Sequence, residues 1–144
     1  MNLFCRAFHG PADWGWVNEQ MGVLRVEDTS GIIGIDADTN ETVAACIMDN
    51  WTRNSVQAHL IIKNSMALRN GFLEEIFDYM YNVKGVNRIY GLVPGDNVKA
   101  LKINAHIGFT EKMRLDDAWE EGIDYVVVEM KKENCNYLPK LEAA

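Results

Sequence analysis

The most informative stretch of this chain reads Asn97-Val98-Lys99-Ala100, and Gly108-Phe109 follows it after seven residues. The apolar run at residues 89–93 precedes this stretch and predicts a buried strand, which Pro94 and Gly95 interrupt. Asp96 or Asn97 can cap a helix whose apolar residues recur at helical spacing until Gly108 ends it. We therefore expect a buried strand, a short capped helix and a further strand in this part of the chain.

Chain length and charge narrow the class of protein. The 144 residues amount to about one domain, which can bury a core without disulfides or metals. No repeat or Pro/Gly/Ser-rich linker interrupts the sequence, so we expect a single domain over residues 1–144. The 14 basic and 21 acidic residues leave a net charge of -7. This charge disfavours nucleic acid and anionic membranes as partners, because their phosphates would be repelled.

The cysteines and the apolar runs indicate the cellular compartment in which the protein is expected. Cys5, Cys46 and Cys135 are odd in number and far apart, so they form neither a disulfide framework nor a zinc pattern, and they suit a reducing cytosol. No run approaches the roughly 18 consecutive apolar residues of a membrane span, and the first ten residues do not resemble a signal peptide. We expect a cytoplasmic protein without a membrane segment.

Periodicity predicts the order of the elements. Strand-like patterns occur at residues 3–8, 31–36, 42–51, 56–62, 89–93, 110–115 and 125–130. Helical patterns occur at residues 13–21, 65–83 and 97–107, and a turn containing Asp116, Asp117 and Gly122 joins the last two strands. This order predicts an α/β or α+β sandwich, in which helices flank a mixed, mostly antiparallel sheet.

The pattern Asn-x-x-Ala followed by Gly-Phe resembles the second cofactor-side motif of the GCN5-related N-acetyltransferases, the GNAT family. Residues 86–130 are similar to a short branch of that family often carried by phages, and the element order over residues 31–130 also matches. The resemblance implies a GNAT-like acyl-CoA N-acyltransferase fold. It also implies an enzyme that transfers the acetyl group of acetyl-CoA directly to an amine without a metal. The alternative is an ordinary capped helix with a C-terminal glycine.

The resemblance places the cofactor pyrophosphate at the start of the helix at residues 65–83, where free N–H groups and the helix dipole favour anions. The family pattern there is Gln/Arg-x-x-Gly-x-Gly/Ala. Its best register falls on Leu68, Gly71 and Leu73, so only the middle glycine is retained. We expect cofactor binding by Leu68, Arg69, Asn70, Gly71 and Phe72. The alternative is that Gly71 only permits close packing and that Arg69 is a solvated surface residue.

The resemblance further implies that the strand at residues 56–62 splays from the strand that follows in the sheet. Backbone groups of Ile61, Ile62 and Lys63 would then be free for pantetheine and for the thioester oxygen, as an oxyanion hole. Asn97 and Ala100 would face the pantetheine arm, with Asn97 also capping its helix and Ala100 leaving room. Capping alone is a sufficient reason for an asparagine at position 97.

His59 is the candidate general base. It lies in this strand on the face shared with Gln57 and Ile61, and imidazole as a group titrates near neutral pH. The family often places a glutamate in this region, but residues 56–63 contain no carboxylate. Asp49 or Asn50 on the neighbouring strand could orient the imidazole. The alternative is a hydrogen-bonded structural histidine.

Asn104 occupies the position, four residues before Gly-Phe, at which the family carries a tyrosine as general acid. An amide has no labile acid proton, so water or another group protonates the leaving thiolate, or catalysis is impaired. Tyr90 and Tyr125 are alternatives by residue type, although aromatic residues in strands more often pack. Cys46 lies in an apolar run without a basic neighbour, so we expect an inert thiol.

The expected partner is an amine acceptor, either a small molecule or a peptide, and a homodimer is left open. Trp14 and Trp16 could line the acceptor pocket if their short helix forms the acceptor side, as in relatives. Acidic residues in the same region would favour a cationic acceptor, namely Asp13, Glu19, Glu27 and Asp28.

Two other classes of function compete with the enzyme. One is a CoA-binding or structural, partner-binding protein on the same fold, which Asn104 and the altered glycine pattern favour. The other is an unrelated mixed-sheet ligand-binding domain. A fold shared with enzymes does not establish activity. An open cleft lined by His59 would favour the enzyme, and a cleft filled by side chains would favour the structural protein.

Overall fold

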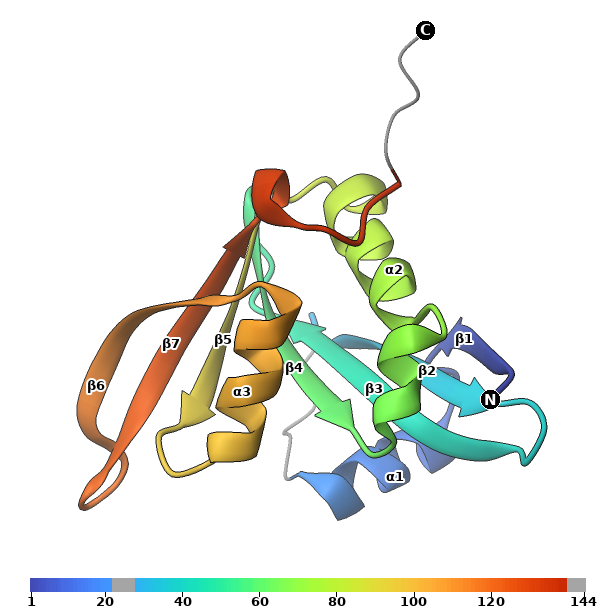
Figure 1. Cartoon of the computed structure of the whole chain (residues 1–144), viewed down its shortest axis with the longest axis horizontal. Coiled ribbons are helices and arrows are strands. Elements are labelled where there is room, and N and C mark those ends of the chain that lie inside the picture. Colours follow the sequence, from blue (N-terminus) through green and yellow to red (C-terminus); the bar gives the residue numbers. More distant parts are fainter. Residues whose placement is uncertain (22–27, 140–144) are drawn as a thin grey trace, which may run out of the picture.

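The computed structural model of the chain describes residues 1–21 and 28–139, and it contains a seven-stranded sheet in the order β1-β2-β3-β4-β5-β7-β6 (Figure 1). The strands are β1 Leu3–Ala7, β2 Ser30–Asp36, β3 Glu41–Asp49, β4 Ser55–Ile62, β5 Arg88–Pro94, β6 Thr110–Glu120 and β7 Ile123–Lys131. The helices are α1 Pro11–Gln20, α2 Phe72–Phe77 and α3 Val98–Ile107. Three shorter segments are η1 Ser65–Arg69, η2 Asp78–Val83 and η3 Lys132–Asn134. The mixed, mostly antiparallel sheet flanked by helices is confirmed.

In the sheet described above, β4 and β5 are paired in parallel and the other neighbouring strands are antiparallel. Strands β1 to β4 pair in sequence order and are antiparallel. Short turns join β2 to β3 and β3 to β4, whereas α1 lies in the connection from β1 to β2. The chain then crosses over through η1, α2 and η2, so β5 runs parallel to β4. Strand β7 returns between β5 and β6 and is antiparallel to both. The parallel pair therefore lies inside the sheet, next to the helices of the crossover.

The segment predicted as one helix over residues 65–83 is divided into three pieces. η1 is a 3-10 turn, α2 is α-helical and η2 is π-helical. Gly71 separates the first two pieces, because its φ of 100° is left-handed and outside the helical region. The predicted apolar stripe is still correct, since Phe72, Ile76 and Met80 are fully buried. Among the described residues, no helix has the length and apolarity needed to cross a bilayer.

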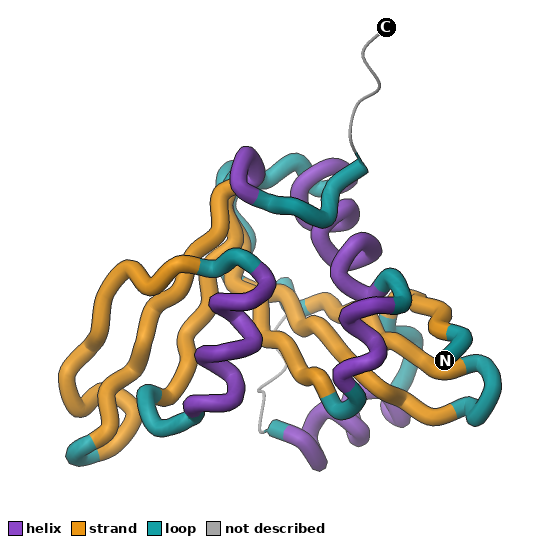
Figure 2. Tube along the Cα trace, in the orientation of Figure 1, coloured by secondary structure: helices purple, strands orange, loops and turns teal. Residues whose placement is uncertain are grey.

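The core has two sides, one on each face of the sheet. Alternate residues of β4, Val56 to Ile62 in steps of two, pack with the buried side chains of α2. The intervening residue Ile61 packs on the opposite face, against a cluster that includes Ile47 and Val17 of α1. Figure 2 shows α3 and the α2–η2 segment on the same side of the strands. Side chains of β4 therefore face two different environments in alternation.

The turn predicted around Asp116 and Asp117 is wrong, because β6 continues through these residues to Glu120. The pairing with β7 shifts register between Leu115 and Glu120, and Asp117 has a φ of 54°. The Asp117 carboxylate accepts the Gly122 N–H at 2.8 Å, so it closes the actual turn from inside the strand. The acidic residues thus form a bulge, which periodicity does not distinguish from a turn.

Candidate functional site

Strands β4 and β5 pair over only three residues and then diverge. Ser55, Val56 and Gln57 pair with Arg88, Ile89 and Tyr90, and no pairing follows toward Ile62 and Pro94. At the closed end the Asn54 carbonyl accepts the N–H groups of Asn87 at 3.0 Å and Arg88 at 3.1 Å. Figure 1 shows the two strands opening into a V, with α3 across its mouth. The splay implied by the family resemblance is therefore present.

β5 diverges from β4 because β7 pairs with the other edge of β5 along its whole length. Every residue of β5, from Arg88 to Pro94, pairs with β7. Gly91 is the last point of close approach, since a Cβ there would lie 3.1 Å from the Ala58 carbonyl oxygen. Further on, Pro94 has no N–H to offer. β5 therefore follows β7, and a gap opens beside β4.

Strand alternation decides which backbone groups of β4 face this gap. The Lys63 N–H donates to the Val43 carbonyl at 2.9 Å, so the expectation of a free amide at Lys63 is wrong. In an antiparallel pair only alternate residues point toward the partner strand. His59 and Ile61 therefore direct their backbone groups toward β3, in register with Ile47 and Ala45. Leu60 and Ile62 direct theirs into the gap, where β5 no longer provides partners.

The gap is an open cleft rather than a packed interface. Two adjoining hollows of about 100 and 180 Å³ share Leu60, Asn97, Ala100 and Asn104 in their walls. The first also contacts His59, Gly91 and Met21, and the second contacts Ile62 and Lys99. We call these joined hollows the V-cleft. Its walls include five of the residues singled out in the sequence, namely His59, Ile62, Asn97, Ala100 and Asn104.

Asn97 has the local role expected of it. Its side-chain oxygen accepts the Ala100 N–H at 3.1 Å and caps α3, while the same residue lines the V-cleft. The Asn104 carbonyl accepts the N–H groups of Gly108 and Phe109, which ends the helix. α3 thus presents Asn97, Ala100 and Asn104 on one face, at the spacing of successive turns.

His59 reaches the V-cleft from the α1 side of the sheet. Its Nε2 lies 3.2 Å from Oδ2 and 3.3 Å from Oδ1 of Asp49, and the two side chains are 19% and 16% exposed. The Asn50 side-chain amide donates instead to Gln57 Oε1 at 2.6 Å. Of the two residues considered as orienting partners, the geometry selects Asp49.

The other reactive side chains are placed away from the cleft. Cys46 is fully buried, and burial raises the pKa of its thiol to about 12, which agrees with an inert cysteine. Burial first, and the charge of Asp49 second, raise the pKa of Tyr90. Neither Tyr90 nor Tyr125 contacts the two hollows of the V-cleft. Tyr125 instead packs against Trp119, with ring centroids 5.4 Å apart.

The residues expected at the cofactor pyrophosphate lie around the start of α2. Gly71, left-handed, precedes the helix, and Asn70 donates from its side chain to the Met66 carbonyl at 2.7 Å. Arg69 is exposed, while Leu68 packs against the core. The Phe72 side chain is fully buried, so it cannot contact a cofactor, and only its backbone is available. These residues line neither hollow of the V-cleft.

Asp13 is not available to attract a cationic acceptor. Its carboxylate accepts from both terminal nitrogens of Arg6, with Arg6 Nη2 at 2.9 Å, and from the His9 N–H at 3.1 Å. Glu27 lies outside the described residues, and Glu19 is exposed on α1. The most buried of the acidic residues that were expected to attract a cationic acceptor is therefore already paired with Arg6.

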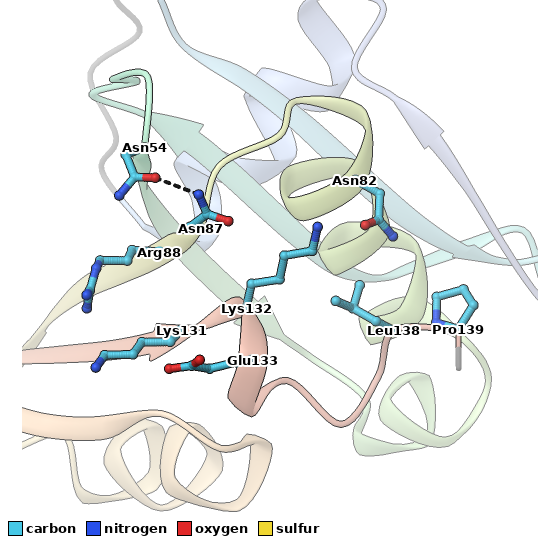
Figure 3. A pocket seen from close by; sticks show the side chains of 9 residues that line it. All are labelled: Asn54, Asn82, Asn87, Arg88, Lys131, Lys132, Glu133, Leu138 and Pro139. Atoms are coloured by element: carbon cyan, nitrogen blue, oxygen red, sulfur yellow. Dashed lines mark hydrogen bonds between the residues drawn. The ribbon is translucent and has the colours of Figure 1, made fainter. Parts of the chain in front are cut away.

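A larger hollow, about 770 Å³, lies at the closed end of the V and shares no residue with the V-cleft (Figure 3). It contains Arg88, Lys131 and Lys132, but their side chains do not converge. Figure 3 shows Lys132 directed toward Asn82, and Arg88 and Lys131 directed away from it. Arg88 is also paired with Glu129. Over residues 1–21 and 28–139, no group of His, Cys, Asp and Glu is arranged to hold a metal.

Solved structures with the same architecture include spermidine N-acetyltransferases. The spermidine/spermine N-acetyltransferase SpeG from Vibrio cholerae in complex with manganese ions superposes with a TM-score of 0.73 and 14% identity, over 90% of this chain and 92% of that one. The Vibrio cholerae spermidine N-acetyltransferase in complex with CoA and spermine gives a TM-score of 0.74 and 13% identity, over 92% and 97%. This chain therefore has the GNAT fold.

Comparison of the sequence alone finds no relative. No known family profile matches the chain, and no curated protein matches it significantly. The likeness to a phage branch of the family therefore stays a prediction.

Proposed function

We propose that this chain, which has the GNAT fold, transfers the acetyl group of acetyl-CoA directly to an amine. The observation that carries the proposal is the V-cleft, where backbone groups of β4 that β5 leaves unpaired, the capped start of α3 and His59 meet. An extended acyl-bearing arm can occupy such a gap as if it were a strand, because the missing partner leaves donors and acceptors along Leu60 and Ile62.

The same geometry suits the two ends of acetyl-CoA. The pantetheine arm would lie between β4 and α3, with Asn97 as a polar contact and Ala100 leaving space. The pyrophosphate would lie toward Arg69, Asn70 and Gly71, where the backbone turns into α2. Arg69 has no carboxylate partner among the described residues, so its charge is available to a phosphate.

The chemistry needs an oxyanion donor and a base. The Leu60 N–H points into the V-cleft beside His59 and is the nearest candidate for the thioester oxygen. Removing one such donor from an enzyme costs roughly 2.7–4 kcal/mol of transition-state stabilisation. His59 would take the amine proton. Asn104 can donate a hydrogen bond to the thioester but has no acid proton to give.

The alternative is a CoA-binding or partner-binding protein that has lost catalysis, and Asn104 is the residue that favours it. Two observations support the enzyme instead. The V-cleft is open, and His59 lines it while being held by Asp49. A protein kept only for its surface would be expected to fill this gap with side chains.

The acceptor in this proposal is an amine. The Vibrio cholerae structure with CoA and spermine makes polyamines the first compounds to test. The Asp49 carboxylate lies on the α1 side of the V-cleft and could attract a cationic amine. A cytoplasmic location and a homodimer stay predictions.

Ligand binding tests the proposal first. Thermal unfolding is recorded with acetyl-CoA, with CoA and with ATP, because a ligand at about 100 times its dissociation constant stabilises a protein by about 2.7 kcal/mol. Stabilisation by acetyl-CoA and CoA but not by ATP is the expected result. Equal effects of all three, or none, would contradict a specific acyl-CoA site.

A matched pair of variants locates the binding. Ala100→Phe fills the V-cleft, whereas Ala105→Phe adds the same ring to the exposed side of α3. Only the first should abolish the acetyl-CoA shift. Release of free thiol with a panel of amines then measures transfer. Binding without transfer to any amine would favour the impaired protein.

A further inference from the structure

We propose that Asp49 is a positioning residue that fixes the tautomer of His59, so that Nδ1 is the nitrogen that exchanges protons with the substrates. This inference rests on the proposed acetyl transfer. Asp49 holds Nε2 at 3.2 Å, and a carboxylate accepts hydrogen bonds but does not donate them. Nε2 therefore carries the hydrogen, and Nδ1 keeps a free lone pair on the other side of the ring.

The sheet register places the two side chains together. Ile47 is opposite His59 and Asp49 is opposite Gln57, so Asp49 and His59 are diagonal neighbours on one face of β3 and β4. Gln57, the neighbour of His59 on this face of β4, is also held in place, since the Asn50 side chain donates to it and Gln57 is buried. With most of both side chains buried, the imidazole has little freedom to turn. The orientation is thus set by strands rather than by a loop.

The charged and titratable groups around His59 are few. Asp49 faces it from β3, and Tyr90 faces Asp49 from β5. From α1 and its end, the apolar side chains packed on this side of the sheet are Trp14, Trp16, Val17 and Met21. The buried carboxylate of α1, Asp13, is paired with Arg6 of β1. α3 presents the neutral amides Asn97 and Asn104, and Lys99 lines the outer hollow. Among the described residues that line the V-cleft, His59 and Lys99 are the titratable ones.

One ring nitrogen can then serve both proton transfers. The neutral amine attacks the thioester carbonyl carbon, a C–N bond forms, and Nδ1 takes the amine proton. The C–S bond breaks, with its electron pair leaving on sulfur, and the imidazolium returns the proton from Nδ1 to the thiolate. Amide and thiol are released and the imidazole is neutral again. Nitrogen and sulfur are attached to the same carbon in the intermediate, so both lie within reach of Nδ1.

The tautomer is measurable without any activity. Nitrogen-15 NMR of the neutral imidazole distinguishes the two ring nitrogens, and His59→Gln identifies the His59 signal among the three histidines. We expect hydrogen on Nε2 alone in the wild-type chain, and both tautomers in Asp49→Ala. Hydrogen on Nδ1, or an unchanged tautomer ratio in the variant, would overturn the inference. Because this measurement needs no substrate, it is independent of the proposed function.

Kinetics then test the consequence for transfer. Asp49→Ala should lower kcat by about 10- to 100-fold with KM for acetyl-CoA changed by less than about twofold, as expected when a group acts through another residue. Asp49→Glu should recover part of kcat. The exposed-site control Asp116→Asn should leave both kcat and the KM for acetyl-CoA unchanged. Tyr90→Phe should keep kcat within about twofold, because a tyrosine acid is not needed. A large loss in Tyr90→Phe, or an unchanged kcat in Asp49→Ala, would contradict the assigned roles.

Discussion

Arg6 and Asp13 join the edge strand β1 to α1. The Asp13 side chain is 7% exposed, and its hydrogen bond from Arg6 is the main reason that the pKa of its carboxyl is lowered. A carboxyl whose pKa is lower in the folded chain stabilises the fold above its unfolded pKa. That contribution disappears as the pH falls through the folded pKa. The stabilisation that this pair gives to the packing of α1 against β1 is therefore lost in acid.

Replacing Asp13 tests this pair. Asp13→Asn should lower the free energy of unfolding by about 2 kcal/mol at neutral pH, because Arg6 loses its charged partner. The difference from wild type should shrink as the pH falls to about 3. Urea unfolding at both pH values measures it, with the exposed Glu19→Gln on the same helix as control. A difference that is the same at both pH values would show that the charge of Asp13 is not the cause.

Gly91 controls how closely β4 and β5 approach before they diverge. A Cβ at this position would lie 3.1 Å from the Ala58 carbonyl oxygen and 3.6 Å from Val128 Cγ2. Gly91→Ala should therefore destabilise the fold by about 1 kcal/mol, since backbone must move to admit the methyl group. In α1, Gly15 has nothing within 4 Å of its added Cβ, and Gly15→Ala should stabilise by about 0.5–1 kcal/mol. Opposite signs in chemical denaturation are the expected outcome.

The start of α3 combines a cap with a cleft wall. Asn97→Ala should cost about 1 kcal/mol of stability, because the Ala100 N–H loses its acceptor. Asn97→Asp keeps an oxygen at the cap and should retain the stability. If Asn97 also contacts pantetheine, then Asn97→Asp should still weaken acetyl-CoA binding in calorimetry. Unchanged binding in Asn97→Asp would leave the cap as the sole role of this side chain.

β6 is an edge strand with exposed apolar side chains. Met113, Leu115 and Trp119 are 55%, 39% and 51% exposed, and one edge of β6 has no partner strand among the described residues. We expect the homodimer, if the chain forms one, to use this surface. Light scattering should then show a dimer that Met113→Lys dissociates, whereas Val83→Lys, at an exposed apolar residue of η2, has no effect. A monomer in the wild type would end this prediction.

At the scale of the whole molecule, the sequence predicts correctly those features that depend on residues close together in one helix or strand. The apolar stripe of α2, the alternation that separates His59 from Leu60, and the Asn97 cap depend on neighbouring residues alone, and each is present. The break of the predicted 65–83 helix at Gly71 and the bulge at Asp117 were missed. Both depend on positive φ angles, which apolar spacing does not reveal.

The sequence determined the order of strands and helices, the two faces of the sheet and the side chains available for chemistry, because these follow from residue spacing along one element. Only the tertiary structure decided that β4 and β5 part after Gln57, that the Lys63 N–H bonds to Val43 while the backbone of Leu60 faces the gap, and that Asp49 rather than Asn50 holds His59. Each of these depends on strand register and on the competing pairing of β5 with β7. Register is a property of contacts between distant segments, so spacing within one segment does not contain it.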